Sequence, residues 1–62
     1  MMSELTLREL NYMEEQINRE QLMVKKFRMY ADYCTDPQLK QKCEEIASKH
    51  QDHYLRLINH LN

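Results

Sequence analysis

One glutamate and two histidines are the residues of this sequence whose types and spacing could do chemistry. Glu20 interrupts a row of apolar residues in the first half of the chain, and His50 and His53 stand three residues apart in the second half. In a helix, this spacing places both imidazoles on one face. Helical bundles commonly hold a metal ion with a glutamate from one helix and such a pair from the next. The spacing therefore indicates a candidate metal site made of Glu20, His50 and His53.

A second interpretation of the same three residues needs no metal. Glu20 would accept hydrogen bonds from the imidazoles or from Tyr54, and this buried polar layer would fix the register of the helices and the choice of partner. Polar residues within an apolar row are more often structural than catalytic. Both interpretations stay open at this level, and Tyr54 is the candidate hydrogen-bond partner beside the ligands.

Two long helices must position these residues. The chain has no glycine and a single proline, so regular structure is plainly interrupted at one place only. Thr6 and Glu9 fit a capping box at the start of the first helix. Asp36 and Pro37 fit the N-cap and the first helical position of the second helix. One domain over residues 1–62 is predicted, with helices at about 6–34 and 37–61 and a turn at about 34–36.

Apolar residues recur along both predicted helices in alternating steps of three and four. In the first helix, with a gap at Glu20, the row is Leu10, Met13, Ile17, Val24, Phe27, Ala31 and Cys34. In the second helix it is Leu39, Cys43, Ile46, His50, His53, Leu57 and His60, widened by Ala47, Tyr54 and Leu61. Such rows are typical of antiparallel helices that pack at a shallow angle. The predicted fold class is all-α, an antiparallel two-helix hairpin.

Glu20 is expected to lie opposite the histidine pair. In an antiparallel hairpin that turns at residues 34–36, the numbers of facing residues sum to about 71. Glu20 is therefore level with position 51, which lies between His50 and His53. The three ionisable groups should meet inside the apolar row.

The length of the chain predicts self-association. A chain of 62 residues rarely builds a sufficient core alone, and two cysteines cannot supply a disulfide framework. The apolar faces are also wider than one partner helix can cover. We therefore predict a homodimer through these faces that closes a four-helix bundle. The heptad count turns Leu22 and Met29 away from the row, and they form the candidate surface for assembly beyond the dimer.

Charge and hydropathy argue against several classes of partner. Nine basic and ten acidic residues give a formal charge of -1, so neither nucleic acid nor an anionic membrane is expected as a partner. The apolar stretches are too short for a transmembrane helix, and no signal-peptide pattern is present. We expect synthesis in the cytoplasm, with Cys34 and Cys43 as reduced thiols. Without a glycine loop or a nucleophile beside a base, no enzymatic activity is expected.

Four short motifs resemble the coat F family of spore coat proteins from spore-forming bacteria. They are Glu20-Gln21-Leu22, Lys26 to Ala31, Asp36-Pro37-Gln38-Leu39-Lys40, and Ile46-Ala47 leading to His53-Tyr54. The resemblance covers roughly residues 5–61 and implies a ferritin-like helical fold. It implies a structural protein of the spore coat, or of sporulation, that is located in the coat and has other coat proteins as partners.

The same resemblance implies an alternative function, a dimeric ferritin-like metal-binding protein. The ferritin-like group binds metal through a helix glutamate and a Glu-x-x-His pair, which map to Glu20 and to positions 50 and 53. His50 stands where the pattern has a carboxylate. A neutral imidazole removes negative charge that two oxidised irons need. Zinc, iron and manganese are the candidate ions, and the donor set favours zinc or another divalent ion over a diiron oxidase centre.

Overall fold

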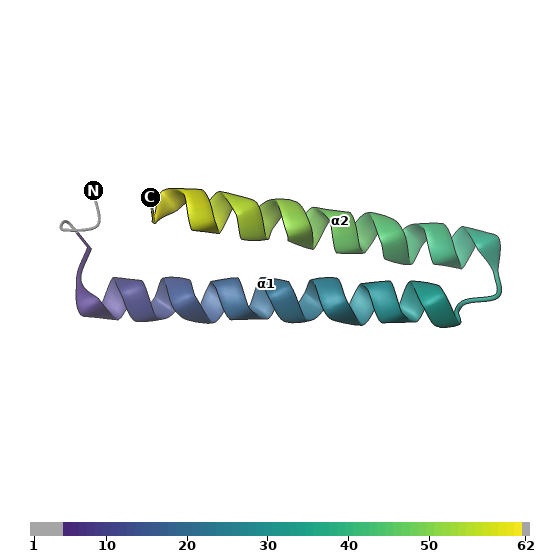
Figure 1. Ribbon diagram of the computed structural model, residues 1–62, viewed down its shortest axis with the longest axis horizontal. Helices are drawn as coiled ribbons and strands as arrows, with labels where there is room; N and C mark the ends of the chain where they lie inside the picture. The colour runs from purple at the N-terminus through teal and green to yellow at the C-terminus, as the bar shows by residue number, and fades with distance from the viewer. Residues whose placement is uncertain (1–4, 62) are drawn as a thin grey trace.

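The protein is an antiparallel helical hairpin, and the computed structural model describes residues 5–61 (Figure 1). Helix α1 comprises Leu7–Tyr33, and helix α2 comprises Pro37–His60. No strand occurs within the described residues, so the predicted two-helix hairpin is confirmed. The ends of the predicted domain, residues 1–4 and 62, lie outside the described part.

Both helices begin with the capping residues that the sequence predicts. The Thr6 hydroxyl accepts a hydrogen bond from the Glu9 backbone N–H at 3.1 Å, and the Glu9 carboxylate accepts one from the Thr6 N–H at 3.2 Å. At the start of α2, the Asp36 carboxylate accepts from the Gln38 N–H at 2.9 Å, and Pro37 takes the first helical position. These contacts satisfy backbone donors that the start of a helix leaves unpaired.

The turn is stabilised by Lys40, to which the sequence motifs assigned no structural role. Cys34 is the C-cap of α1, and its N–H donates to the Tyr30 carbonyl at 3.0 Å. From α2, the Lys40 ammonium donates to the Ala31 carbonyl at 3.2 Å. A cation at the end of a helix satisfies a free carbonyl and complements the helix dipole. Lys40 therefore joins the first turn of α2 to the last turn of α1.

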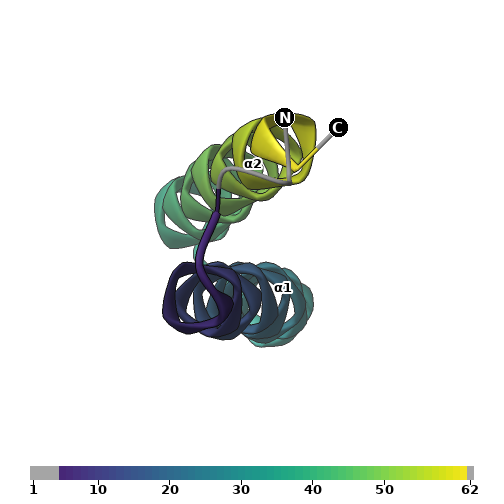
Figure 2. The same ribbon diagram turned by 90° about the vertical axis from the view of Figure 1, so that its left-hand side faces the viewer.

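The hairpin is long and thin, with extents of 48 × 15 × 10 Å. Its Cα radius of gyration is 14.6 Å, whereas a compact domain of this length has about 11 Å. The two ribbons lie closer together at the turn than at the termini (Figures 1 and 2). Neither described helix has the combination of length and apolar character needed to span a bilayer.

The buried core is small and lies in the half of the hairpin next to the turn. Only Val24, Ala31, Cys43 and Ala47 are buried among the described residues, and none of those residues has a large side chain that is fully buried. In the half next to the termini, the apolar residues on the facing sides are half-buried: Leu10, Met13, Ile17, Leu57, Ile58 and Leu61. One hairpin is therefore well packed at its turn and incompletely packed towards its ends.

The buried face of α2 is rotated relative to the predicted row. Ala47, which the pattern placed at the edge of the row, is only 3% exposed, and Tyr54 is half-buried. Leu39, His53 and His60, which the pattern placed on the row, are exposed. In the single hairpin, these three positions lie outside the contact between α1 and α2. The physical reason is that the small side chain of Ala47 lets the helices approach closely, so this residue takes the centre of the contact.

The two cysteines lie near the turn in different environments. Cys43 is buried and Cys34 is half-buried, and both are free thiols. Burial raises the pKa of the Cys43 thiol, and the adjacent Cys34 raises it further. The folded protein therefore holds this proton more tightly than the unfolded chain does. The resulting stability is fully present below the ordinary thiol pKa and is lost as the pH rises through the raised value.

We expect iodoacetamide to alkylate Cys43 at least about tenfold more slowly than Cys34 at about pH 8, because the thiolate is the nucleophile and Cys43 is buried. Timed alkylation followed by mass spectrometry of the two peptides gives both rates from one sample. Unfolding in urea should bring the rates together. Equal rates in the folded protein would show that Cys43 is not protected.

Candidate metal centre

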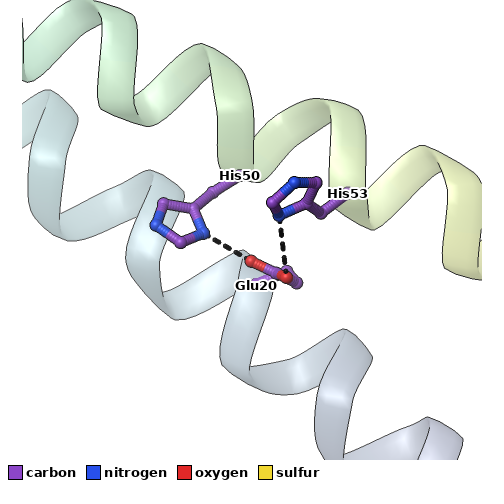
Figure 3. A group of neighbouring side chains, drawn as sticks. All are labelled: Glu20, His50 and His53. Atoms are coloured by element: carbon purple, nitrogen blue, oxygen red, sulfur yellow. Dashed lines mark hydrogen bonds and ion pairs between the residues drawn. The ribbon is translucent and has the colours of Figure 1, made fainter.

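Glu20 of α1 lies between His50 and His53 of α2 (Figure 3). One ligand atom from each of the three residues lies within 4.8 Å of the others. Oε1 of Glu20 is 2.5 Å from Nδ1 of His50, and Oε2 is 3.3 Å from Nδ1 of His53. Each carboxylate oxygen is thus turned towards a different imidazole.

The contact between Glu20 and His50 is a short hydrogen bond across the two helices. An ionised carboxylate can only accept, so the Nδ1–H of His50 donates to it. Hydrogen bonds that involve a charged group are shorter and stronger than those between neutral groups. This bond orients the carboxylate and the ring of His50 relative to each other.

The site has a covered side and an open side. The side chains of Glu20 and His50 are 16% and 24% exposed, whereas that of His53 is 52% exposed. The ring of Phe27 stacks on His50 with centroids 6.3 Å apart and planes at 22°. The His50 ring meets His53 edge-on at 5.9 Å. Phe27 and Glu20 therefore fix the orientation of His50, while His53 faces solvent.

Close packing at the turn brings the three residues into register. Val24 and Ala47 are the buried residues nearest to the site on the two helices, and Glu20 and His50 each follow about one helical turn further from the hairpin turn. The buried residues therefore all lie on the turn side of the site, and the helices diverge towards the termini (Figure 1). An additional contact between the helices at this position would stabilise the half of the hairpin that is less well packed.

Tyr54 lies on a groove that does not include the three site residues. Gln21, Val24 and Gln51 are among the residues that line this groove with Tyr54. Within residues 5–61, no hydrogen bond joins Tyr54 to Glu20. Successive residues of a helix point about 100° apart, so Tyr54 and His53 face different directions.

The open side of the site borders a shallow groove of about 340 Å³, lined by residues that include Tyr12, Gln16, Glu20, His53, Arg56 and His60. An ion from solvent can therefore reach Glu20 and His53 directly. Arg56 is a cationic neighbour that the sequence analysis did not single out. The sequence could have predicted this neighbour, because Arg56 is three residues after His53 and that spacing places both side chains on one face of α2.

Leu22 and Met29 lie on the surface of α1, as the heptad count predicts. They are 51% and 45% exposed, and their spacing of seven residues places them on one side of the helix.

The three donors suit one divalent ion better than a pair of irons. A glutamate and two neutral imidazoles supply a single negative charge. Zinc is commonly bound by three such oxygen and nitrogen ligands with a fourth position left open. Two oxidised irons need more carboxylates to offset their charge, and this cluster contains Glu20 alone.

The comparisons with known proteins give one relative. Over 50 residues, the chain is 36% identical to "Uncharacterized protein YuzM" of Bacillus subtilis (strain 168), a match that covers 81% of this chain. The match spans only 62% of the length of YuzM. No family model and no solved structure matches the chain.

Proposed function

We propose that the protein is a non-catalytic structural component of the spore coat, or of sporulation, and that it acts through self-association. The supporting observation is that the single hairpin exposes more surface to solvent than a compact protein of the same mass. The accessible surface is 5285 Å², whereas a compact protein of 7.7 kDa has about 4,300 Å². The excess of about 1,000 Å² is close to the roughly 800 Å² that each partner contributes to a standard protein interface.

The binding partner that best fits this surface is a second copy of the chain. The half-buried apolar residues near the termini, such as Ile17 and Leu57, continue the contact faces of both helices. A second hairpin placed against these faces would complete a four-helix bundle. Further large apolar side chains are exposed on the single hairpin: Leu7, Tyr12, Leu22, Met29, Tyr30, Tyr33, Leu39 and Leu55.

The assignment to the spore coat rests on the coat F motifs of the sequence. In the structure, one of these motifs, Asp36-Pro37-Gln38-Leu39-Lys40, forms the N-cap and the first turn of α2. Asp36 caps α2 and Lys40 binds the end of α1. These residues therefore stabilise the hairpin, which is the unit that would assemble.

Assembly beyond the dimer requires a second surface, for which Leu22 and Met29 are the candidates. Replacing both with lysine should leave the helical circular dichroism and the dimer mass unchanged, because both side chains already face solvent. Growth of larger assemblies, measured by light scattering, and the amount of protein extracted with the coat fraction should fall several-fold, since two charges would have to be desolvated at the contact.

Asn11 and Asn18 provide the matched control. Both are exposed, and they have the same seven-residue spacing on α1. The Asn11→Lys/Asn18→Lys variant adds the same charge and should assemble like the unchanged protein. If the Leu22/Met29 variant assembles equally well, these two residues have no role in the coat.

A dimeric ferritin-like metal-binding protein is the second candidate function. The cluster of Glu20, His50 and His53 favours it, because the three ligand atoms lie within 4.8 Å of one another and can be reached from solvent. Elemental analysis of protein purified without chelator separates the two candidates. A structural protein would carry no stoichiometric metal, whereas the second candidate predicts one that survives dialysis.

A further inference from the structure

We propose that Glu20, His50 and His53 bind one divalent ion of the zinc type in each hairpin, and that this ion fastens α1 to α2 at the point where the helices diverge. The inference deepens the second candidate function and rests on its premise that the cluster binds metal. It adds that each hairpin binds a single ion, with all three protein ligands from one chain.

The distances between the donors are close to those of a mononuclear site. Two ligands at about 2.0–2.1 Å from one zinc ion, at a near-tetrahedral angle, lie about 3.3 Å from each other. Oε2 of Glu20 and Nδ1 of His53 are already 3.3 Å apart. Oε1 of Glu20 and Nδ1 of His50 are closer, at 2.5 Å, because the Nδ1–H donates to the carboxylate. A small rotation of the Glu20 side chain into the open groove would bring this pair to the ligand distance.

Binding of the ion is an exchange with this proton. For the Nδ1 lone pair of His50 to bind the ion, the ring must keep its one proton on Nε2. A doubly protonated ring releases its Nδ1 proton to solvent, and a neutral ring exchanges it through solvent for a proton on Nε2. The proton on Nδ1 of His53 is lost in the same way or moves to Nε2. Phe27 keeps the His50 ring in place by stacking, so little ordering of that ligand is needed when the metal enters.

The charges around the cluster define the fourth ligand. A divalent ion with the Glu20 carboxylate and two neutral imidazoles retains one positive charge. The groove supplies Arg56 as a further cation. Water or a small anion such as chloride therefore completes the coordination on the groove side, where the site is open.

An ion in this position would stabilise the weakly packed half of the hairpin. Within the described chain, no buried residue lies between the site and the ends of the chain. The side chains of the site therefore make the contact between the helices that lies just beyond the buried core. A ligand that binds only the folded state raises stability with its concentration. At a zinc concentration about 100-fold above its Kd, the melting temperature should rise by about 20 °C.

The test is calorimetric titration of the full chain with zinc sulfate, after dialysis against chelator. The expected result is one ion per chain. The affinity should fall at least about 100-fold in the Glu20→Gln and His53→Ala variants, because loss of a ligand costs more than loss of a residue that merely orients one. Glu14→Gln is the matched control for Glu20→Gln, since Glu14 is exposed on the same helix and lies outside both the cluster and its groove, and its affinity should be unchanged.

Two further measurements keep the result interpretable. Circular dichroism shows whether each variant is folded, and Glu20→Gln preserves the shape of the side chain. Cysteine thiolates are common zinc ligands, and Cys34 and Cys43 are free. The titration is therefore repeated with Cys34→Ala/Cys43→Ala and with cobalt, whose spectrum reveals thiolate ligands. Binding that disappears only in the cysteine variant, or that is equal in the unchanged protein and His53→Ala, would overturn the inference.

The mass of the protein in chelator is measured in parallel. A dimer that persists without metal and binds no zinc would refute the metal site and leave the proposed structural function intact. A monomer that binds one zinc ion would support the metal site and contradict self-association.

Discussion

Replacing Ala47 with aspartate should unfold the hairpin at room temperature, with loss of most of the helical circular dichroism signal. Ala47 is 3% exposed at the centre of the contact between the helices, where Val24 and Ala31 are also buried. A carboxylate there has no cationic partner within the described core and costs about 3 kcal/mol or more. A chain this small has a core that contributes only about 3–5 kcal/mol, so one such substitution removes nearly all of its stability.

The adjacent residue provides the control for this substitution. Ser48 is exposed on the same helix, so Ser48→Asp adds the same charge without burying it. Its effect should stay within about 0.5 kcal/mol, as for most surface substitutions. Equal stability of the two variants in urea titrations would show that Ala47 does not lie in a helix contact.

Dilution should lower the melting temperature of the unchanged protein by about 5 °C for each tenfold step. Folding and dimerisation are coupled in our proposal, because the single hairpin buries only four residues among those described. Each tenfold dilution then removes about 1.4 kcal/mol from the stability of the dimer. Circular dichroism melts over a hundredfold range of concentration, recorded with chelator present, measure this slope. A melting temperature that does not depend on concentration would mean that one hairpin is stable alone.

The hairpin could be predicted because its signals are local. Thr6 and Asp36 are capping residues whose hydrogen bonds involve neighbours within three positions, and within a helix Pro37 is well tolerated only in the first turn. The rotation of α2 could not be predicted in this way. It depends on how closely α1 approaches Ala47, and the spacing of apolar residues does not distinguish a small residue at the centre of a contact from one at its edge.

The residues of the site were predictable, but their environment was not. Antiparallel register alone brought Glu20 opposite His50 and His53, and the structure confirms that the three meet. The exposure of His53 followed from the rotation of α2, so the site is open where the sequence placed it inside the row. The stacking of Phe27 on His50 depends on side-chain conformations, which the spacing of residues in the sequence does not predict.

Sedimentation equilibrium of the full chain in chelator tests the central claim of self-association most directly. The chain has a mass of 7.7 kDa, and we predict a species of twice this mass at micromolar concentrations, with dissociation on dilution accompanied by loss of helical signal. A helical species with the mass of a single chain at every concentration would contradict the account.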